Sequence, residues 1–570
     1  MNQPSLPVGF DVNKRGVFSL RSPALLIGLI TFVGLVIRLW KIDFGLPEVP
    51  FTNEEITSYR ALNLASGDFN PHNFVHPHLY YYLSFFLDAL YILGGLATRR
   101  FHNLSEAWTL YKTDPTVFYV IGRSLSALFG TLTIPLTYWV GKKAFNEKVG
   151  ILGSLFLAFS LLHVQWSQIA YMDVPLTFFV VLSFLFGFLA FEKGRLWDFI
   201  LCGLCGGLSA STKYQGSVTL IWGPLACFLY ALRNQQNPFQ ALGSTKNLLF
   251  LLSFLIGFTL GTPFWILSFP EFLNHFLLNW GWIKPYGQGH TGMEGNWNWF
   301  YYLQPLTSYS VGFSVLACGI IGALFLARRT NACNLFFLSF PGLYFLIAGA
   351  AKLRQVKYLM PILPFICISA AFFLVEWVER GTAKRGSQRV LAALFWAGFL
   401  AVLPTAISTL RYNYLKMFPD TRKLASAWVD TYVSPESSVL ITSLTFYRPP
   451  AATGPQTVDL DPTLMDQRAN NRSSLKSLDE YREEGFDYVV LDEWHLQLLL
   501  VEEVNNPKYQ EAIKRYQKFL DDLKKSATLV AEFSPYRGEK AEYDRENVFL
   551  ASRSLWKLKS LGPLVQIYKL

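Results

Sequence analysis

The sequence predicts a polytopic α-helical membrane protein with a soluble α/β domain in its C-terminal part. Of the 570 residues, 52% are hydrophobic and only 16% are charged, a composition too apolar for a soluble chain of this length. Apolar runs of about 20 residues, the length that crosses a bilayer, recur between Pro23 and Leu410. No such run follows Leu410. The chain therefore divides into a membrane region and a soluble tail.

We expect about eleven transmembrane helices in the membrane region. The apolar runs that predict them begin near Pro23, Val117, Gly150, Val174, Trp197, Gly216, Asn247, Tyr309, Asn334, Tyr358 and Val390. The first run is interpreted as a retained signal-anchor helix, because basic residues precede it and no small-residue cleavage site follows it.

The basic residues predict the orientation of these helices. If the chain starts inside, alternate turns hold most of the basic residues: Lys142, Lys143, Lys148, Lys193, Arg195, Arg233, Lys246, Arg328, Arg329, Arg380, Lys384, Arg385 and Arg389. The positive-inside rule places these turns in the cytoplasm. The net charge of +10 is then explained by topology and an anionic membrane surface, and we expect no nucleic-acid partner.

One apolar segment, Val75 to Thr98, does not fit this alternation. It is long enough to span a bilayer, but a span there would reverse every later helix and place the basic turns outside. We therefore interpret residues 75–98 as an interfacial or re-entrant helix.

The predicted domains follow from these assignments. Residues 1–409 form the membrane domain, with a first outer loop at residues 41–116, and residues 410–570 form a soluble domain on the outer face. In the tail, short β-rich runs (SSVLITS, DYVVLDE, ATLVAEF and NVFLA) alternate with helical stretches at 421–432, 474–484 and 507–526. This alternation predicts a small α/β layer.

The stretch from Phe51 to Leu83 holds the most unusual polar residues. Glu54 and Glu55 follow the first span directly, and ionised carboxylates are costly in hydrocarbon, so they must be hydrated or act on something that arrives at the membrane surface. The ordinary alternative is a solvated pair at the start of a helix.

The order of motifs resembles the GT-C class of glycosyltransferases that use polyprenyl-phosphate sugars, in particular the family-39 type with protein O-mannosyltransferases and aminoarabinose transferases. That family has an acidic pair, a Gly-Asp, an Asn-Pro and a His-Pro or Tyr-Pro before a Tyr-rich run. Here these motifs correspond to Asn53-Glu54 or Glu54-Glu55, Gly67-Asp68, Asn70-Pro71, and His76-Pro77 before Tyr80 to Tyr82. HVQWSQIAYMDVP, STKYQG, GTPFW and KLRQVKYLMPILP continue the resemblance across residues 20–410.

The resemblance implies a set of site residues. Transfer from a polyprenyl-phosphate sugar needs a base for the acceptor hydroxyl and cations for the leaving phosphate. The expected catalytic residues are Glu54, Glu55 and Asp173, with Glu54 as the base. The expected donor phosphate ligands are Lys213, Arg354, Lys357 and Tyr358, and Asn53, Asp68, His76 and Tyr81 are expected to bind substrate or acceptor. For the lysines and Arg354, anchoring at the membrane interface is the alternative.

One departure from the family pattern leaves the activity open. Asn53 occupies the position that spacing assigns to the family's catalytic Asp, and an amide cannot act as a general base. Either Glu54 takes that role in a shifted register, or the activity is altered or lost. The alternatives are a non-catalytic carrier or binding protein for a lipid-linked sugar, and a GT-C enzyme that moves oligosaccharides.

The remaining expectations concern cofactors, partners and location. No His pair has a zinc-helix spacing such as HExxH, and a divalent metal ion stays open as a cofactor. The expected partners are a polyprenyl-phosphate sugar donor, membrane lipids, and a lipid, glycan or protein acceptor. We expect an integral protein of the bacterial inner membrane whose active site faces the periplasm or the exterior.

Overall fold

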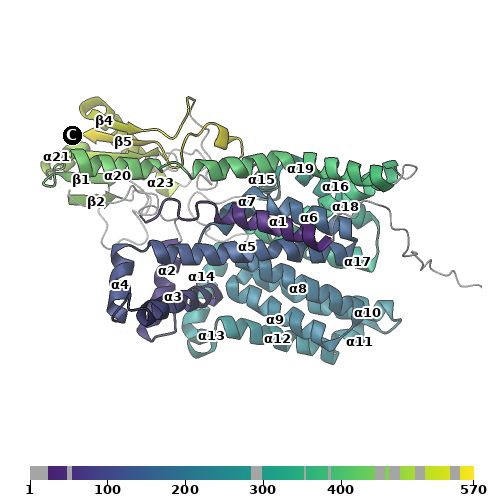
Figure 1. Cartoon of the computed structure of the whole chain (residues 1–570). Coiled ribbons are helices and arrows are strands. Elements are labelled where there is room, and N and C mark those ends of the chain that lie inside the picture. The colour runs from purple at the N-terminus through teal and green to yellow at the C-terminus, as the bar shows by residue number, and fades with distance from the viewer. Residues whose placement is uncertain are drawn as a thin grey trace, which may run out of the picture.

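The computed structural model describes residues 23–47, 54–283, 298–351, 355–382, 387–442, 456–460, 476–493, 507–539 and 552–570. Most helices of the membrane region run side by side (Figure 1). Helices α2, α3 and α4 and the C-terminal sheet lie at one end of this bundle, which we call the outer end. The turns that join α5 to α6, α8 to α9, and α16 to α17 lie at the opposite end. We call it the basic end, because the predicted cytoplasmic Lys and Arg residues of the described chain gather there.

The bundle is built from helices of different lengths. Its elements are α1 (Pro23–Leu39), α5 (Thr116–Ala144), α6 (Glu147–Ala158), α7 (Leu161–Ser167), α8 (Asp173–Lys193), α9 (Leu196–Thr212), η2 (Tyr214–Ile221), α10 (Trp222–Arg233), α11 (Pro238–Leu242), α12 (Thr245–Gly261), α13 (Phe264–Leu267), α14 (Phe269–Ile283), α15 (Asn298–Pro305), η3 (Leu306–Ser310), α16 (Gly312–Arg328), α17 (Ala332–Ala350), η4 (Val356–Ile362), α18 (Leu363–Thr382) and α19 (Ser387–Leu415).

The polytopic helical fold is confirmed. By length and composition, eight helices of the described chain can cross a membrane, or nine if α6 and α7, which bend by 60°, form one span. Helices α1, α9 and α16 are apolar but have only 17 residues each. Leaving α3 aside, these helices coincide with the apolar runs predicted from the sequence.

The first outer loop folds into α2 (Glu54–Asn63), η1 (Leu64–Ser66), α3 (Leu79–Ala97) and α4 (Leu104–Thr113). Helix α3 is long and apolar enough to span, and it packs against α2, α9, α12 and the outer part of α5, where the Tyr80 hydroxyl donates to the Gly122 carbonyl at 2.8 Å. Ile92, further along α3, packs against Phe118 in the first turn of α5. These contacts favour the interfacial interpretation, which stays a prediction.

Local sequence explains how α8 and α9 place their ends. Helix α8 begins with Asp173 and Pro175 in its first turn, where an acid complements the helix dipole and a proline is tolerated. It ends at Lys193, and Gly194, with a left-handed φ of 65°, caps it. Helix α9 packs closely against α12, because a Cβ at Gly203 or Gly207 would collide with backbone carbonyls of α12. This packing fixes the position of Lys213, which follows the last residue of α9.

The soluble domain is a three-layer α/β unit. Its sheet has the order β2-β1-β3-β5-β4, formed by β1 (Ser438–Thr442), β2 (Gln456–Leu460), β3 (Tyr488–Asp492), β4 (Thr528–Phe533) and β5 (Val565–Lys569). Strand β1 is parallel to β2 and β3, whereas β5 is antiparallel to β3 and β4. Val489 and Leu491 pack with α21 (Leu478–Glu483) and α23 (Pro507–Ser526), and Val490 packs with α20 (Thr421–Tyr432). The α/β prediction is confirmed.

Several details of the tail differ from prediction. Helix α19 continues to Leu415, so the predicted boundary at residue 410 falls inside it, because the apolar run ends before the helix does. The helix expected at 474–484 is shorter, and the run NVFLA lies outside the described residues. The domain rests on the outer end of the bundle, where Arg411 donates to the carbonyls of Leu555 and Leu558.

Candidate active site

An ion pair between Asp173 and Lys213 forms the centre of the site. Asp173 opens α8 and Lys213 follows α9, so the tight α8 and α9 packing brings them together at the outer end. Lys213 Nζ lies 2.8 Å from Asp173 Oδ1, and both side chains are buried. The second carboxylate oxygen, Oδ2, is also buried and accepts no hydrogen bond from the described residues. Buried polar atoms are rarely left in this state, so this oxygen is available to a ligand.

A second lysine meets the first across Tyr171. Lys213 Nζ is 5.8 Å from the centre of the Tyr171 ring and Lys357 Nζ is 4.9 Å from it. Lys213 Nζ also lies 5.0 Å from the Tyr358 ring, and Lys357 Nζ lies 5.0 Å from Trp166. Cation–π contacts of this kind hold ammonium groups in place while their N–H groups can still bind an anion.

The first outer loop completes this cluster. His76 Nε2 is 3.2 Å from the Tyr171 hydroxyl, and Arg60 Nη1 donates to the Tyr81 hydroxyl at 3.0 Å. Burial, and then the positive charges of Lys213, Lys357 and Arg60, lower the pKa of His76 well below its ordinary value, so the ring is neutral at pH 7. We call Asp173, Lys213, Lys357, Tyr171 and His76 the lysine cluster.

Glu54 lies in a different, fully buried ion pair. Arg123 of α5 donates from Nε to Glu54 Oε1 at 2.8 Å and from Nη2 to Oε2 at 2.7 Å, and the Ala170 N–H donates to Oε1 at 2.7 Å. Arg123 Nη1 also donates to the carbonyls of Ile42 and Phe44. The pair thus joins α2, α5, the segment between α7 and α8, and the chain after α1.

This geometry contradicts the expected role of Glu54 as an accessible base. Its side chain has no exposed surface, and both oxygens accept charge-assisted hydrogen bonds, so an acceptor hydroxyl cannot approach it in this arrangement. The physical reason is that Arg123 needs a buried counter-ion in an apolar helix. Glu54 instead fixes the start of α2 and, through Ala170, the backbone next to Tyr171.

Glu55 is exposed, but it faces away from the lysine cluster. Burial, and then the negative charge of Glu55, raise the pKa of Tyr111, so Glu55 lies on the side of α2 that faces α4. Arg60, which faces the cluster, is five residues further along α2, a rotation of roughly 140° in an α-helix. The structure therefore does not bring Glu55 together with Asp173.

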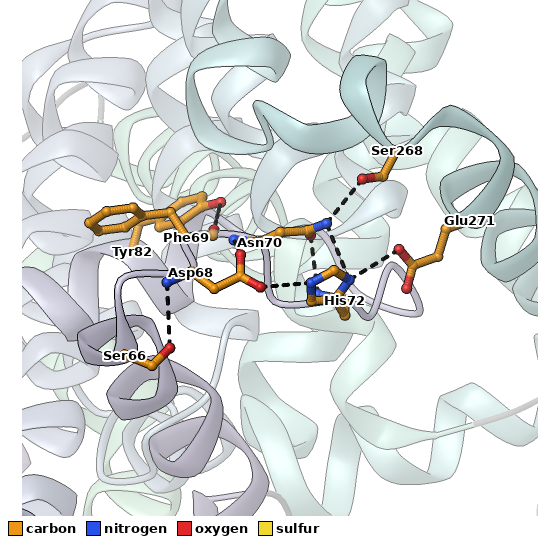
Figure 2. Close-up of polar contacts among 8 residues, drawn as sticks. All are labelled: Ser66, Asp68, Phe69, Asn70, His72, Tyr82, Ser268 and Glu271. Atoms are coloured by element: carbon orange, nitrogen blue, oxygen red, sulfur yellow. Dashed lines mark hydrogen bonds and ion pairs between the residues drawn. The ribbon is translucent and has the colours of Figure 1, made fainter.

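Asp68 belongs to a polar network on the surface of the outer end (Figure 2). Its carboxylate accepts hydrogen bonds from the Asn70 N–H at 2.9 Å and from His72 Nε2 at 2.8 Å, while Asn70 donates to Ser268 at 3.0 Å. His72 Nδ1 lies 3.5 Å from Glu271. The network ties the first outer loop to Ser268 and to the first turn of α14, and the described contacts do not include the lysine cluster.

The predicted residues thus fall into three places. The structure brings together Asp173, Lys213, Lys357, Tyr358 and His76, and Tyr81 lies beside this group. Outside it lie Glu54, in its buried ion pair, and the exposed Glu55 and Asp68. Asn53 and Arg354 lie outside the described residues. No group of three or more His, Cys, Asp or Glu residues that could hold a metal ion occurs in the described part of the chain.

Sequence reasoning missed Arg123, Arg60 and Tyr171. Arg123 interrupts an apolar run, which is costly unless the residue is paired, so its position was a signal for a buried carboxylate partner. Tyr171 lies two residues before Asp173 in a motif already noted. Arg60 has no comparable signal, because a single arginine in an outer loop is common.

Comparisons with known proteins agree on the fold. Residues 100–279 match the family described as dolichyl-phosphate-mannose-protein mannosyltransferase. The archaeal oligosaccharyltransferase AglB from Archaeoglobus fulgidus, in complex with an inhibitory peptide and a dolichol-phosphate, superposes with a TM-score of 0.56 at 11% identity, covering 97% of this chain and 89% of that one. ArnT from Cupriavidus metallidurans bound to undecaprenyl phosphate has a TM-score of 0.51 at 14% identity and covers 95% and 97%. The chain has the GT-C fold.

A curated relative matches part of the chain but carries no described function. An uncharacterized protein of Aquifex aeolicus (strain VF5) is 26% identical over 253 residues, which make up 44% of this chain. The match spans about half of that relative, 48% of its length. The predicted GT-C resemblance is confirmed.

Proposed function

We propose that this GT-C protein transfers a monosaccharide from a polyprenyl-phosphate donor to a lipid, glycan or protein acceptor at the outer end of the bundle. The observation that carries this proposal is the lysine cluster. Two buried ammonium groups flank Tyr171, and one oxygen of Asp173 accepts no hydrogen bond from the described residues. Cations beside a carboxylate are the groups that this transfer requires.

The lysines would bind the donor phosphate. Lys213 and Lys357 are compact point charges that can follow the phosphate as its negative charge increases. The neutral His76 lies within electrostatic range of both lysines and of Arg60. The polyprenyl chain can stay beside the bundle while only the head group enters the cluster. The match to ArnT bound to undecaprenyl phosphate supports a polyprenyl phosphate of this kind as the leaving group.

Asp173 would take the acceptor proton. The acceptor oxygen forms a bond to the anomeric carbon, the bond from that carbon to the phosphate oxygen breaks, and polyprenyl phosphate leaves with the electron pair. The proton of the acceptor hydroxyl passes to Asp173 Oδ2, while Lys213 holds Oδ1. This role replaces the one expected for Glu54, which would position α2 and Ala170 instead.

Binding of undecaprenyl phosphate tests the phosphate site. Lys213→Met should weaken binding by about tenfold or more, since a hydrogen bond to a charged group contributes about 1.5–3 kcal/mol. Lys112→Met is the matched control, because Lys112 lies 5.4 Å from the Trp108 ring in a similar cation–π contact on α4, outside the cluster. If both variants lose binding equally, or if neither loses binding, the proposed phosphate site is contradicted.

A second candidate function is a non-catalytic carrier of the lipid-linked sugar. The burial of Glu54 in an ion pair favours it, because this carboxylate is then withdrawn from chemistry. A carrier would bind donor through the lysine cluster without releasing polyprenyl phosphate in the presence of any acceptor tested. The likeness to AglB keeps transfer of an oligosaccharide as a further alternative, which a panel of mono- and oligosaccharide donors would separate.

The location belongs to the same proposal. With the basic turns in the cytoplasm, the lysine cluster and the soluble domain face the periplasm or exterior of a bacterial inner membrane. The soluble domain would then recognise the acceptor or cover the site, since Arg411 and neighbouring residues dock it on the outer end. Accessibility of an introduced Cys at Lys112 to an impermeant thiol reagent in intact cells tests this orientation.

A further inference from the structure

A cavity at the basic end lies far from the lysine cluster. Its volume is about 520 Å³, within the range of small-molecule sites, and it opens between the ends of α5, α8, α10, α16 and α17. Glu192 of its wall and Asp173 of the lysine cluster are at opposite ends of α8, roughly 30 Å apart at 1.5 Å per residue. The transfer reaction makes no use of this cavity.

Two arginines line the cavity. Arg329 is held in place by Glu376, which accepts from Nη2 at 2.7 Å, and by the Phe372 ring, 5.6 Å from its guanidinium carbon. A guanidinium has five N–H donors, so several remain available to a ligand. The side chain of Arg233, the last residue of α10, makes no hydrogen bond to the described residues and is exposed at the cavity.

Two helix starts add partial positive charge to the same space. Asn146 caps α6 and Asn331 caps α17, and both line the cavity, so the positive ends of these two helix dipoles point toward it. Together with the arginines, they form a site suited to an anion with several oxygen atoms. The remaining wall is largely apolar and includes Phe145 and Phe191.

We propose that this cavity binds the phosphate of a phospholipid head group from the leaflet at the basic end. Basic pockets between transmembrane helices on the cytoplasmic side bind anionic lipid head groups. The apolar wall and the position at the ends of the membrane helices favour a phosphate carried by a lipid over free phosphate. Phosphatidylglycerol is the probe that matches this chemistry.

Glu192 allows a test in which a substitution should tighten lipid binding. It lines the same cavity and makes no ion pair with a described residue, so its carboxylate opposes a bound phosphate. Glu192→Gln should therefore tighten lipid binding by about fivefold, as expected for removing one like charge at a hydrated site. A general loss of folding could not produce tighter binding.

Native mass spectrometry of the purified full chain with phosphatidylglycerol, at one detergent concentration, measures these affinities. Arg233→Gln and Arg329→Gln should each weaken the first binding constant by about tenfold. Arg233→Gln is decisive, because it breaks no hydrogen bond of the described fold, and Arg195→Gln, at the same end but outside the cavity wall, should bind as wild type.

Three results would overturn the proposal. The first is wild-type lipid binding by both Arg233→Gln and Arg329→Gln. The second is weaker binding by Glu192→Gln. The third is displacement of the lipid by an equal concentration of inorganic phosphate, which would make the cavity a site for free phosphate. Because the readout is lipid binding, none of these outcomes depends on sugar transfer.

Discussion

Replacing Glu54 by Gln separates a positioning role from a catalytic one. In the wild type, Glu54 accepts two hydrogen bonds from Arg123 and one from the Ala170 N–H, and neither side chain of the ion pair is exposed. The substitution leaves Arg123 buried without its counter-ion. Removing one partner of a buried pair costs about 3–5 kcal/mol of unfolding free energy, and the carbonyls of Ile42 and Phe44, which still accept from Arg123, favour the lower figure.

Thermal unfolding in detergent at a fixed scan rate, read by tryptophan fluorescence, measures this loss as a fall in Tm of several degrees. Glu55→Gln is the matched control, because its side chain is exposed and its loss should change stability little. In the double variant Glu54→Met/Arg123→Met, no buried charge remains unpaired, so its Tm should lie above that of Glu54→Gln. An unchanged Tm in Glu54→Gln together with complete loss of transfer would refute this reasoning and restore Glu54 as the base.

Three further predictions concern packing, pH and the soluble domain. Gly207→Val should destabilise the protein by about 1–3 kcal/mol, because its Cβ would meet the Phe254 carbonyl of α12. Gly342→Ala should not lower stability, because no atom lies within 4 Å of the added Cβ, and the Tm values of the two variants relative to wild type test this difference. The hydrogen bond to Asp68 raises the pKa of His72, so the stability from this pair is fully present below the unfolded pKa of about 6.5 and is lost as pH rises through the higher folded pKa. The Tm difference between wild type and His72→Gln should therefore shrink from pH 6 to pH 9, and a difference that grows would contradict the assignment. Arg411→Met should loosen the contact between the soluble domain and α19, because the carbonyls of Leu555 and Leu558 lose their donor. Limited proteolysis should then cut the chain after Leu415 faster in Arg411→Met than in the control variant Arg537→Met.

The helical architecture could be predicted because hydropathy acts locally. Apolar runs near Val117, Val174 and Val390 all became helices, and the predicted soluble helices at 421–432 and 507–526 have the bounds that the structure gives. Strands β2 and β5 were missed, since QTVDL and VQIYK are short and mix polar with apolar residues. Their partners in the sheet, not their own sequences, make them strands.

The site was predictable in composition but not in pairing. The motifs pointed to Asp173, Lys213 and Lys357, and the structure brings them together. The sequence could not reveal that Arg123, 69 residues away in the chain, takes Glu54 as its counter-ion. Glu54 and Asp173 are both carboxylates in motifs of the predicted site, and only burial and hydrogen bonding distinguish a positioning residue from an available base.

Single-turnover release of undecaprenyl phosphate from an undecaprenyl-phosphate sugar, by wild type and Asp173→Asn, tests the central claim most directly. Asp198→Asn is the matched control, because Asp198 also lies in the first turn of an apolar helix, α9, but at the basic end. We predict that Asp173→Asn binds the donor and releases at least about a hundredfold more slowly, as expected when a general base is removed, while Asp198→Asn matches wild type. Release by Asp173→Asn at the wild-type rate would contradict the account.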